Sequence, residues 1–244
     1  MTAPQPVTLF ISDLHLSAEQ PRVVANFFRF LESTARRAHA LYILGDLFDY
    51  WVGDDDLGDP FHRSVADALA GLAANGTQLY FMHGNRDFLI GPEFARASRC
   101  TILSDPTVIE LHGMATLLTH GDSLCTDDVE YQRFRALVRT AQWQKTFLAK
   151  PLTERRRAAL GLRAQSEQAK HGKSIEIMDV SAVSVMQLFR AYSVTRVIHG
   201  HTHRPARHEH AVDQVARERW VLSDWRETAP YLQCNASGCD AAEI

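Results

Sequence analysis

Five short clusters of acidic, amide and histidine side chains are spread along the chain, and side chains of these types bind divalent cations. The clusters are Asp13-Leu14-His15, Gly45-Asp46, Gly84-Asn85-Arg86-Asp87, His120-Gly121-Asp122 and Gly200-His201-Thr202-His203. Mixed carboxylate, amide and imidazole ligands suit Mn²⁺, Fe²⁺ or Zn²⁺, whereas the lack of cysteine in the clusters disfavours a structural zinc site. The candidate metal ligands are Asp13, His15, Asp46, Asn85, His120, His201 and His203.

Seven ligands are enough for two cations if Asp46 bridges them through its two carboxylate oxygens. Two cations about 3.5–4 Å apart convert a bound water to hydroxide near neutral pH and neutralise charge that builds on phosphoryl oxygens. Each cluster alone has an ordinary explanation, such as a Gly-Asp or Gly-Asn turn or a histidine that bonds within a loop. Because they occur in order and each follows a strand-like run, they predict a two-metal hydrolase of phosphorus–oxygen bonds.

The runs that precede the clusters have the length and residue types of buried strands. They span residues 7–11, 40–44, 79–82, 115–119 and 194–198. Helical patterns at 22–37 and 61–74 lie between the first three runs, and further strands are expected at 220–222 and 231–233. This alternation predicts an α/β fold with a covered sheet. Ligands bind at the carboxyl ends of strands in such folds, so the five clusters can converge.

Residues 127–173 interrupt the alternation of strands and helices with a mostly helical pattern. A second helix is expected at 175–192. Eleven of the 26 lysine and arginine residues lie between 130 and 173, with apolar residues interleaved. We interpret this stretch as a helical cap inserted into a single domain of residues 1–244. Its composition suits a substrate with an anionic head and an apolar portion, or an anionic membrane surface. The alternative is a solvated helical hairpin with ordinary charges.

The composition is that of a soluble globular protein, with 45% hydrophobic residues, 23% charged residues and a net charge of -3 among 244 residues. This charge argues against a dedicated nucleic-acid binder. We expect neither a signal peptide nor a membrane-spanning helix, because no segment approaches the roughly 20 apolar residues that cross a bilayer. The four cysteines lack zinc-like spacing and are expected to be reduced thiols in a cytoplasmic protein: Cys100, Cys125, Cys234 and Cys239.

In their order, the five clusters resemble the motifs of the calcineurin-like metallophosphoesterases. The resemblance implies a four-layered α/β/β/α sandwich with a dinuclear metal site at the strand ends. One metal would take Asp13, His15, Asp46 and His203, and the other would take Asp46, Asn85, His120 and His201. His83 and His199 lie outside the motifs and are expected to be structural or to support the ligands.

Many members of that superfamily carry histidine after the motif asparagine, where this chain has Arg86. A guanidinium keeps its proton and is a poor general acid, but it binds phosphate well through paired hydrogen bonds. The leaving group should therefore need little protonation, as for a phosphate released from a pyrophosphate. Arg86 thus favours a pyrophosphate bond over a simple monoester as the bond that is cut.

Longer runs, among them LYILGDLFDYWVGDDD, FMHGNRDFLIG and VIHGHTHRPA, resemble the UDP-2,3-diacylglucosamine hydrolase family. This resemblance covers nearly the whole chain. It implies hydrolysis of UDP-2,3-diacylglucosamine to UMP and 2,3-diacylglucosamine 1-phosphate in lipid A biosynthesis, by water attack at the α-phosphorus. It also implies two Mn²⁺ ions and a peripheral position on the cytoplasmic face of the inner membrane. We expect a monomer that binds no nucleic acid.

The same resemblance assigns substrate contacts, and among these Asn85, Arg86 and His201 are the expected catalytic residues. Lys170 stands where relatives often have asparagine. Phe134, Phe147, Leu148 and Leu152 are candidates for lining an acyl-chain site, but core packing is the role that we expect for any one of them. The expected substrate-binding residues are Asn85, Arg86, Asp128, Ser166, Lys170, Lys173 and His201.

Two other functions remain open from the sequence. One is a metallophosphoesterase that acts on a nucleotide diester or another nucleoside diphosphate derivative. The other is a binding scaffold without catalysis, which is disfavoured because all seven candidate ligands are present.

Overall fold

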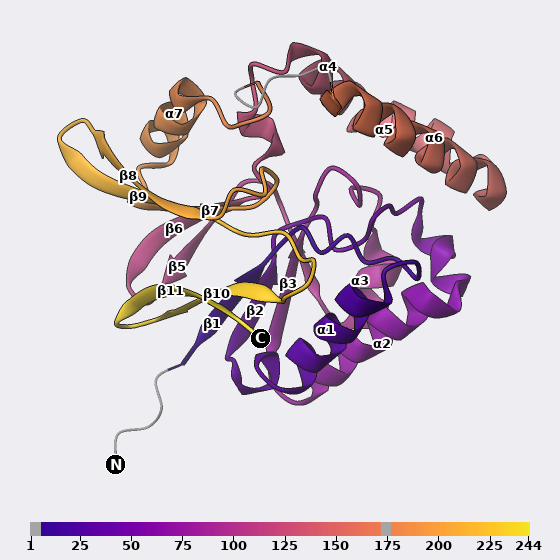
Figure 1. Cartoon of the computed structure of the whole chain (residues 1–244), viewed down its shortest axis with the longest axis horizontal. Coiled ribbons are helices and arrows are strands. Elements are labelled where there is room, and N and C mark those ends of the chain that lie inside the picture. The colour runs from indigo at the N-terminus through magenta and orange to yellow at the C-terminus, as the bar shows by residue number, and fades with distance from the viewer. Residues whose placement is uncertain (1–5, 172–176) are drawn as a thin grey trace.

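The computed structural model describes residues 6–171 and 177–244, and it contains two β-sheets that pack face to face (Figure 1). The six-stranded sheet has the order β11-β10-β1-β2-β3-β4, and the five-stranded sheet has the order β5-β6-β7-β9-β8. The first sheet comprises β1 (Thr8–Ile11), β2 (Ala40–Ile43), β3 (Gln78–Met82), β4 (Thr101–Leu103), β10 (Pro230–Asn235) and β11 (Gly238–Glu243). The second comprises β5 (Thr107–Leu111), β6 (Met114–Thr119), β7 (Arg196–His199), β8 (Ala206–Val212) and β9 (Val215–Val221).

Within residues 6–171 and 177–244, seven α-helices accompany the sheets, together with short 3₁₀ turns at Ala35–Arg37, Asp54–Gly58 and Asp122–Leu124. Proline occupies the first helical position of three of the helices, where its missing N–H leaves no hydrogen bond unmade. The helices are α1 (Pro21–Glu32), α2 (Pro60–Ala74), α3 (Pro92–Ser98), α4 (Val129–Val138), α5 (Ala141–Leu148), α6 (Leu152–His171) and α7 (Ala182–Tyr192).

Alternation of side chains along the strands builds three hydrophobic cores and hence four layers. On β1, Leu9 and Ile11 face helices α1–α3 in the first core, while Phe10 faces the opposite sheet in the second. On β7, Ile198 faces that same inter-sheet core and Val197 packs against α7 in the third. Successive strand residues point to opposite faces, so each central strand serves two cores. The result is the α/β/β/α sandwich that the motif resemblance implies.

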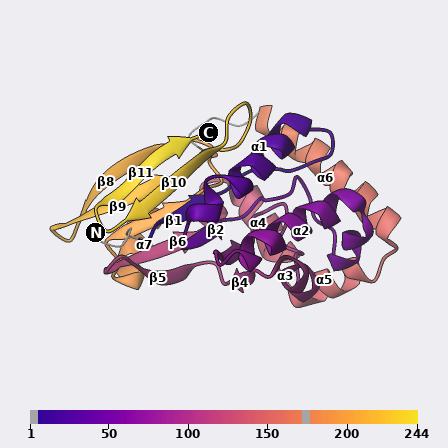
Figure 2. The same cartoon turned by 90° about the horizontal axis from the view of Figure 1, so that it is seen from below.

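Helices α4, α5 and α6 stand apart from these layers, beyond the carboxyl ends of the central strands (Figures 1 and 2). Five arginines join them to aspartates of the sandwich, so much of the region's positive charge holds the helices in place. Arg155 is the most buried of the five, and it also donates to the carbonyl oxygens of Val52 and Lys150. The ion pairs are Arg135–Asp122, Arg139–Asp122, Arg155–Asp55, Arg156–Asp56 and Arg163–Asp49.

Three sequence-based boundaries are corrected by the structure. The helix expected at 22–37 ends at Glu32, where the Ser33 hydroxyl and N–H both bond to the carbonyl of Arg29, and a 3₁₀ turn follows. The strand expected at 194–198 begins at Arg196. The helix expected at 175–192 begins at Ala182, because Ser181 has extended backbone and donates its N–H to Leu124. Residues 175 and 176 lie outside the described part.

The expectation that all four cysteines are reduced is wrong for one pair. Cys234 on β10 and Cys239 on β11 are joined by a disulfide. The two residues are directly opposite each other in the antiparallel β10–β11 pair, with Cα atoms 4.1 Å apart, so their side chains meet across the ladder. Cys100 and Cys125 are free thiols. In the part of the chain that the structure describes, no helix is long and apolar enough to cross a membrane.

Candidate metal centre

The seven candidate ligands lie at the carboxyl ends of strands from both sheets. Asp13 and His15 follow β1, Asp46 follows β2, and Asn85 lies just beyond β3. His120, His201 and His203 follow β6 and β7 in the facing sheet. The N–H of His201 donates to Asp13 Oδ2 at 2.8 Å, and the ring Nδ1 of His120 lies 2.8 Å from the carbonyl of Leu44. These contacts bring the strand ends of the two sheets together at one site.

The backbone of this site is unusual, because five of the seven candidate ligands have positive φ angles. The angles are 56° at Asp13, 49° at His15, 54° at Asp46, 69° at His201 and 53° at His203. Residues other than glycine rarely adopt this left-handed conformation, and it clusters at functional sites. It turns the chain sharply just after the strand ends.

Two motif glycines allow the loops to approach closely. A Cβ atom at Gly84 would overlap the carboxylate of Asp46, and one at Gly200 would overlap Asp13 Oδ2 and the hydroxyl of Ser12. Any residue other than glycine would therefore displace a candidate ligand.

Three of the ligands form a first group that could hold one cation. Asp13 Oδ1 lies 3.3 Å from Nε2 of His203, and Nε2 of His15 lies 3.4 Å from the same nitrogen. Nδ1 of His15 lies 3.8 Å from Oδ2 of Asp46, which brings the fourth predicted ligand of this metal alongside. Among the described residues, Asp13 Oδ1 and His15 Nδ1 are buried without a hydrogen bond. Such buried polar atoms are costly unless something binds them, and a cation fits that need.

The other predicted set of ligands also converges. Oδ1 of Asn85 lies 3.0 Å from Nε2 of His120 and 2.9 Å from Nδ1 of His201. Asp46 Oδ1 lies 3.9 Å from Nε2 of His120, and Asp13, Asp46 and His120 form a second group able to hold a metal ion. Asp46 therefore has one oxygen near each group, as expected of a bridging carboxylate.

The electrostatics of the site reflect its buried negative charge. Burial alone would raise the pKa of Asp13, but contact with His203 and the charge of His120 lower it below its usual value. Although burial opposes protonation of His120, the carboxylates of Asp46 and Asp13 raise its pKa to about 9. The pKa of His201 falls to about 4 through burial and the positive charge of His120. A neutral His201 can present a nitrogen lone pair to a metal.

Two residues outside the predicted set support this arrangement. Asp87 is buried and accepts hydrogen bonds from the N–H groups of Gly84 at 2.8 Å, Leu47 at 2.7 Å and Asp46 at 3.3 Å, so it ties the loops after β2 and β3. Tyr131 on α4 stacks on His201 with ring centroids 5.9 Å apart. The position of Asp87 after Asn85 was a signal in the sequence, whereas Tyr131 lay unmarked in the helical region.

The hydroxyl of Tyr131 connects the histidine to a buried acidic group. It donates to Oδ2 of Asp122 at 2.6 Å, and Nε of Arg135 donates to the same oxygen at 2.7 Å. Asp122 belongs to the motif that contains His120, so α4 is held directly against that motif.

A cavity of about 630 Å³ opens between the candidate ligands and helices α4–α6. It is lined by Asn85, Arg86 and His201 together with Asp128 and Ser166, which places five of the predicted substrate-binding residues on one cavity. Asp128 also caps α4, where its carboxylate accepts the N–H of Tyr131 at 3.1 Å. Lys170 lies in α6 but its side chain is not among those described, and Lys173 lies outside the described residues.

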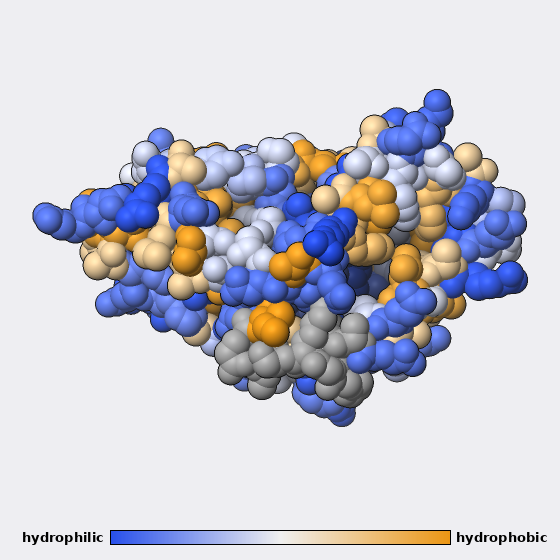
Figure 3. Space-filling view, turned by 90° about the horizontal axis from the view of Figure 1, so that it is seen from above, coloured by the Kyte–Doolittle hydropathy of each residue, from blue (hydrophilic) through white to orange (hydrophobic). Residues whose placement is uncertain are grey.

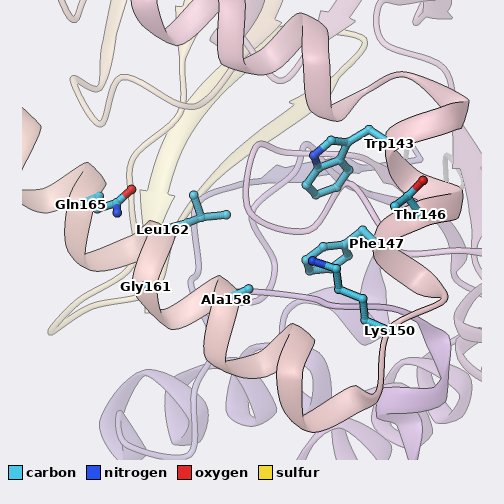
Figure 4. Close-up of a pocket in the computed structure, with 8 residues that line it drawn as sticks. All are labelled: Trp143, Thr146, Phe147, Lys150, Ala158, Gly161, Leu162 and Gln165. Carbon is cyan, nitrogen blue, oxygen red and sulfur yellow. The ribbon is translucent and has the colours of Figure 1, made fainter.

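The wall of this cavity that α4–α6 provide is partly apolar, with contributions from Phe134, Trp143 and Phe147. A smaller pocket of about 350 Å³ lies between α5 and α6, where the stacked rings of Trp143 and Phe147 face Leu162 (Figure 4). Of the four candidates for an acyl site, Phe134 and Phe147 line the larger cavity, and Phe147 also packs in the first core. Leu152 packs against the first core instead, and Leu148 is exposed.

The two histidines outside the motifs make structural contacts. Nε2 of His83 lies 2.7 Å from the carbonyl of Ile90. His199 is fully buried, with Nδ1 2.9 Å from the carbonyl of Gly200 and Nε2 2.9 Å from Nη1 of Arg219. Because Arg219 can only donate, Nε2 of His199 accepts and Nδ1 carries the proton. His199 therefore shapes the loop from which His201 projects.

Comparisons with known proteins identify the family of the chain. A family model described as calcineurin-like phosphoesterase matches residues 6–205. The UDP-2,3-diacylglucosamine hydrolase of Aromatoleum aromaticum is 54% identical over 230 residues, which cover 94% of this chain and 94% of that protein. Proteins of the same name from Escherichia coli (49% identical, 94% of this chain and 95% of the relative) and Chromohalobacter salexigens (51% identical, 90% and 89%) are also similar. The chain belongs to the calcineurin-like phosphoesterases and, within them, to the UDP-2,3-diacylglucosamine hydrolase family.

Proposed function

We propose that this protein hydrolyses the pyrophosphate bond of UDP-2,3-diacylglucosamine to UMP and 2,3-diacylglucosamine 1-phosphate, as a step of lipid A biosynthesis. The main support is the 54% identity to a UDP-2,3-diacylglucosamine hydrolase over 94% of both chains. The convergence of the candidate ligands on a partly apolar cavity agrees with a substrate that has a diphosphate head and acyl chains.

The donor set fits two divalent cations, which we propose to be Mn²⁺. Asp13, His15, Asp46 and His203 would hold one, and Asp46, Asn85, His120 and His201 would hold the other. Such a pair of cations supplies hydroxide near neutral pH and neutralises phosphoryl charge. The fit rests on the buried oxygen of Asp13 and nitrogen of His15 that lack hydrogen bonds, and on the chemistry of the donors, which favours ions other than structural zinc.

The residues of the chain supply binding and orientation. Arg86 lines the cavity beside the candidate ligands, where its guanidinium can form charge-assisted hydrogen bonds to phosphate oxygens. It cannot act as an acid, so the sugar phosphate departs as an anion without a proton from Arg86. His201, held neutral by its lowered pKa and stacked on Tyr131, and Asn85 complete the proposed catalytic set.

We also propose that residues 127–173 form a cap over the sandwich and that its apolar side chains shelter the acyl chains. Each buried CH₂ group of an acyl chain contributes about 0.8 kcal/mol to binding. Phe134, Trp143 and Phe147 are placed for this role, since they line the cavity that also contains Arg86 and His201.

Hydrolysis in ¹⁸O-labelled water with Mn²⁺ and UDP-2,3-diacylglucosamine tests the reaction. Label in UMP is expected, because water attack at the α-phosphorus leaves the new oxygen on the nucleotide. Label found only in the sugar phosphate would refute attack at that atom. Equal activity on a soluble UDP-sugar without acyl chains would instead favour a general nucleoside diphosphate hydrolase.

We further propose that the protein lies peripherally on the cytoplasmic face of the inner membrane. We propose that it acts as a monomer. Apolar and hydrophilic residues lie side by side on the face that carries helices α4–α6 (Figure 3). Exposed Leu137, Leu148 and Leu160 lie on these helices, and exposed Lys145 and Lys150 lie in α5 and in the turn after it. Co-sedimentation with phosphatidylglycerol vesicles is expected, with weaker binding to phosphatidylcholine and loss of binding in high salt. Equal recovery in the supernatant with both lipids would contradict it.

A further inference from the structure

The side chain of Arg86 lies between two carboxylates of the loop that follows β2. Its Nη1 donates a hydrogen bond of 2.8 Å to Oδ1 of Asp49, whereas its Nε lies 3.8 Å from Oδ2 of Asp46. The backbone is held as well, because the N–H of Arg86 donates to Asp46 Oδ1 at 2.8 Å and its carbonyl accepts from the N–H of Trp51 at 3.0 Å. Asp49 is thus the closer of these two carboxylates to the guanidinium.

Asp49 has a second cationic neighbour, which comes from the helical cap. Nη1 of Arg163 on α6 lies 2.6 Å from Oδ2 of Asp49, so each carboxylate oxygen faces one arginine. The side chain of Asp49 is only 4% exposed, while those of Arg86 and Arg163 are 18% and 37% exposed. All three line the 630 Å³ cavity. The buried carboxylate therefore joins a loop of the sandwich to the cap at the wall of the substrate cavity.

Resting on the proposed function, we propose that Asp49 is a positioning residue. It holds the guanidinium of Arg86 toward the substrate phosphates, and Arg163 makes this orientation depend on the placement of helix α6 over the cavity. Loss of either arginine would leave part of a buried carboxylate without its countercharge, so the three groups should act as one unit.

The position of Asp46 explains why such a residue is needed. Asp46 is a candidate ligand of both metals and lies within ion-pair distance of Arg86. A guanidinium that turned fully toward Asp46 would move away from the phosphates and compete with cations for the oxygens of Asp46. Because Asp49 accepts the hydrogen bond from Nη1 of Arg86, the guanidinium stays available to the substrate phosphate and the carboxylate of Asp46 stays available to the metals.

Asp49→Asn keeps the shape of the side chain and removes its charge. In the Mn²⁺-loaded full-length enzyme, we expect kcat for the diacylated UDP-sugar to fall about 10- to 100-fold, the scale of loss when a binding group is misplaced by about 1 Å. Metal content and Tm should remain near those of the unmodified protein. A purely structural role predicts the opposite pattern, with a lowered Tm and little change in kcat per folded molecule, and that result would overturn the proposal.

A double-mutant cycle tests the link to the cap. Arg163→Gln should lower kcat in the unmodified background and have little further effect in the Asp49→Asn background, because its partner is already gone. Arg163→Lys should restore part of the loss by returning the charge. If the fold-losses of kcat from the two single changes multiply in the double variant, Arg163 acts independently of Asp49. That result would refute the claim that the orientation of Arg86 depends on helix α6.

The matched control is Asp213→Asn, which breaks an exposed ion pair with Arg190 on α7 while leaving the cavity untouched. It should keep full activity. Affinity for UMP, measured by calorimetry with Mn²⁺ present, separates this inference from the proposed function. A protein that fails to hydrolyse the diacylated sugar refutes the function, yet weaker UMP binding in both Arg86→Gln and Asp49→Asn would still support the positioning role. Unchanged UMP affinity in Asp49→Asn would overturn it.

Discussion

At the scale of single residues, the backbone of Gly200 passes so close to Asp13 that it leaves no room for a side chain. In Gly200→Ala the added methyl would overlap Asp13 Oδ2 and the hydroxyl of Ser12. We expect loss of bound metal and at least a 100-fold loss of activity, because the displaced Asp13 is a proposed ligand of one of the two cations and a small misplacement at a reacting centre is costly. Elemental analysis and turnover measurements check this. Gly71→Ala in α2 is the control, because nothing lies within 4 Å of its added Cβ. The free energy of unfolding of this variant should rise by about 0.5–1 kcal/mol. Full metal occupancy in Gly200→Ala would contradict the steric argument.

The buried His199 should make stability depend on pH. Burial and the charge of Arg219 lower its pKa to about 3, whereas the unfolded chain protonates histidine near pH 6.5. Below pH 6.5 His199 becomes protonated in the unfolded chain, whereas in the folded protein it stays neutral down to about pH 3. The free energy of unfolding should therefore decrease by about 1.4 kcal/mol for each unit by which the pH is lowered in that window.

Urea unfolding of metal-free protein at pH 6.5 and pH 5.5 measures this contribution. The unmodified protein should lose about 1 kcal/mol more between these values than His199→Asn, which cannot protonate but can still accept a hydrogen bond from Arg219. Parallel losses in the two proteins would show that His199 is not held neutral.

At the scale of secondary-structure elements, α6 depends on Arg155. This side chain is 3% exposed and bonds to Asp55, Val52 and Lys150. We expect Arg155→Met to loosen the cap and leave the sandwich folded, since it removes contacts that α6 makes to the loop after β2. Faster amide exchange confined to α4–α6 is the measurement. Arg157→Met, on an exposed neighbour in the same helix, should leave exchange unchanged, and similar exchange in both variants would argue against the anchor.

The elements that the sequence predicted well are those with a strong apolar pattern. The central strands β1, β2, β3 and β6 were predicted within one residue of their bounds, because each contains a short run of mostly apolar residues that is largely buried. Strands β8 and β11 were missed, since β8 has one buried residue and β11 has none, and α3 is only 7 residues long. Convergence of the candidate ligands followed from their position at strand ends. The contact between Asp49 and Arg163 could not be predicted, because it joins residues far apart in sequence through the placement of α6.

At the scale of the whole molecule, the metal site and the hydrophobic cores are separate sources of stability. The three cores lie between the layers, so the protein should stay folded without metal. Mn²⁺ at 100 times its Kd should add about 2.7 kcal/mol, which for a chain of this size raises Tm by about 5–10 °C. Thermal unfolding after chelation, with and without added Mn²⁺, tests this. No shift at saturating Mn²⁺, or an equal shift in Asp46→Asn, would contradict binding at this site.

The left-handed backbone at five of the candidate ligands has a consequence for engineering. A non-glycine residue in this conformation costs about 1–2 kcal/mol, and here that cost recurs at Asp13, His15, Asp46, His201 and His203. Glycine at these positions would relieve the backbone while removing the metal donors. A screen that selects for thermal stability alone would therefore favour variants that have lost candidate metal ligands. Mutations intended to stabilise the enzyme should be made outside these five positions.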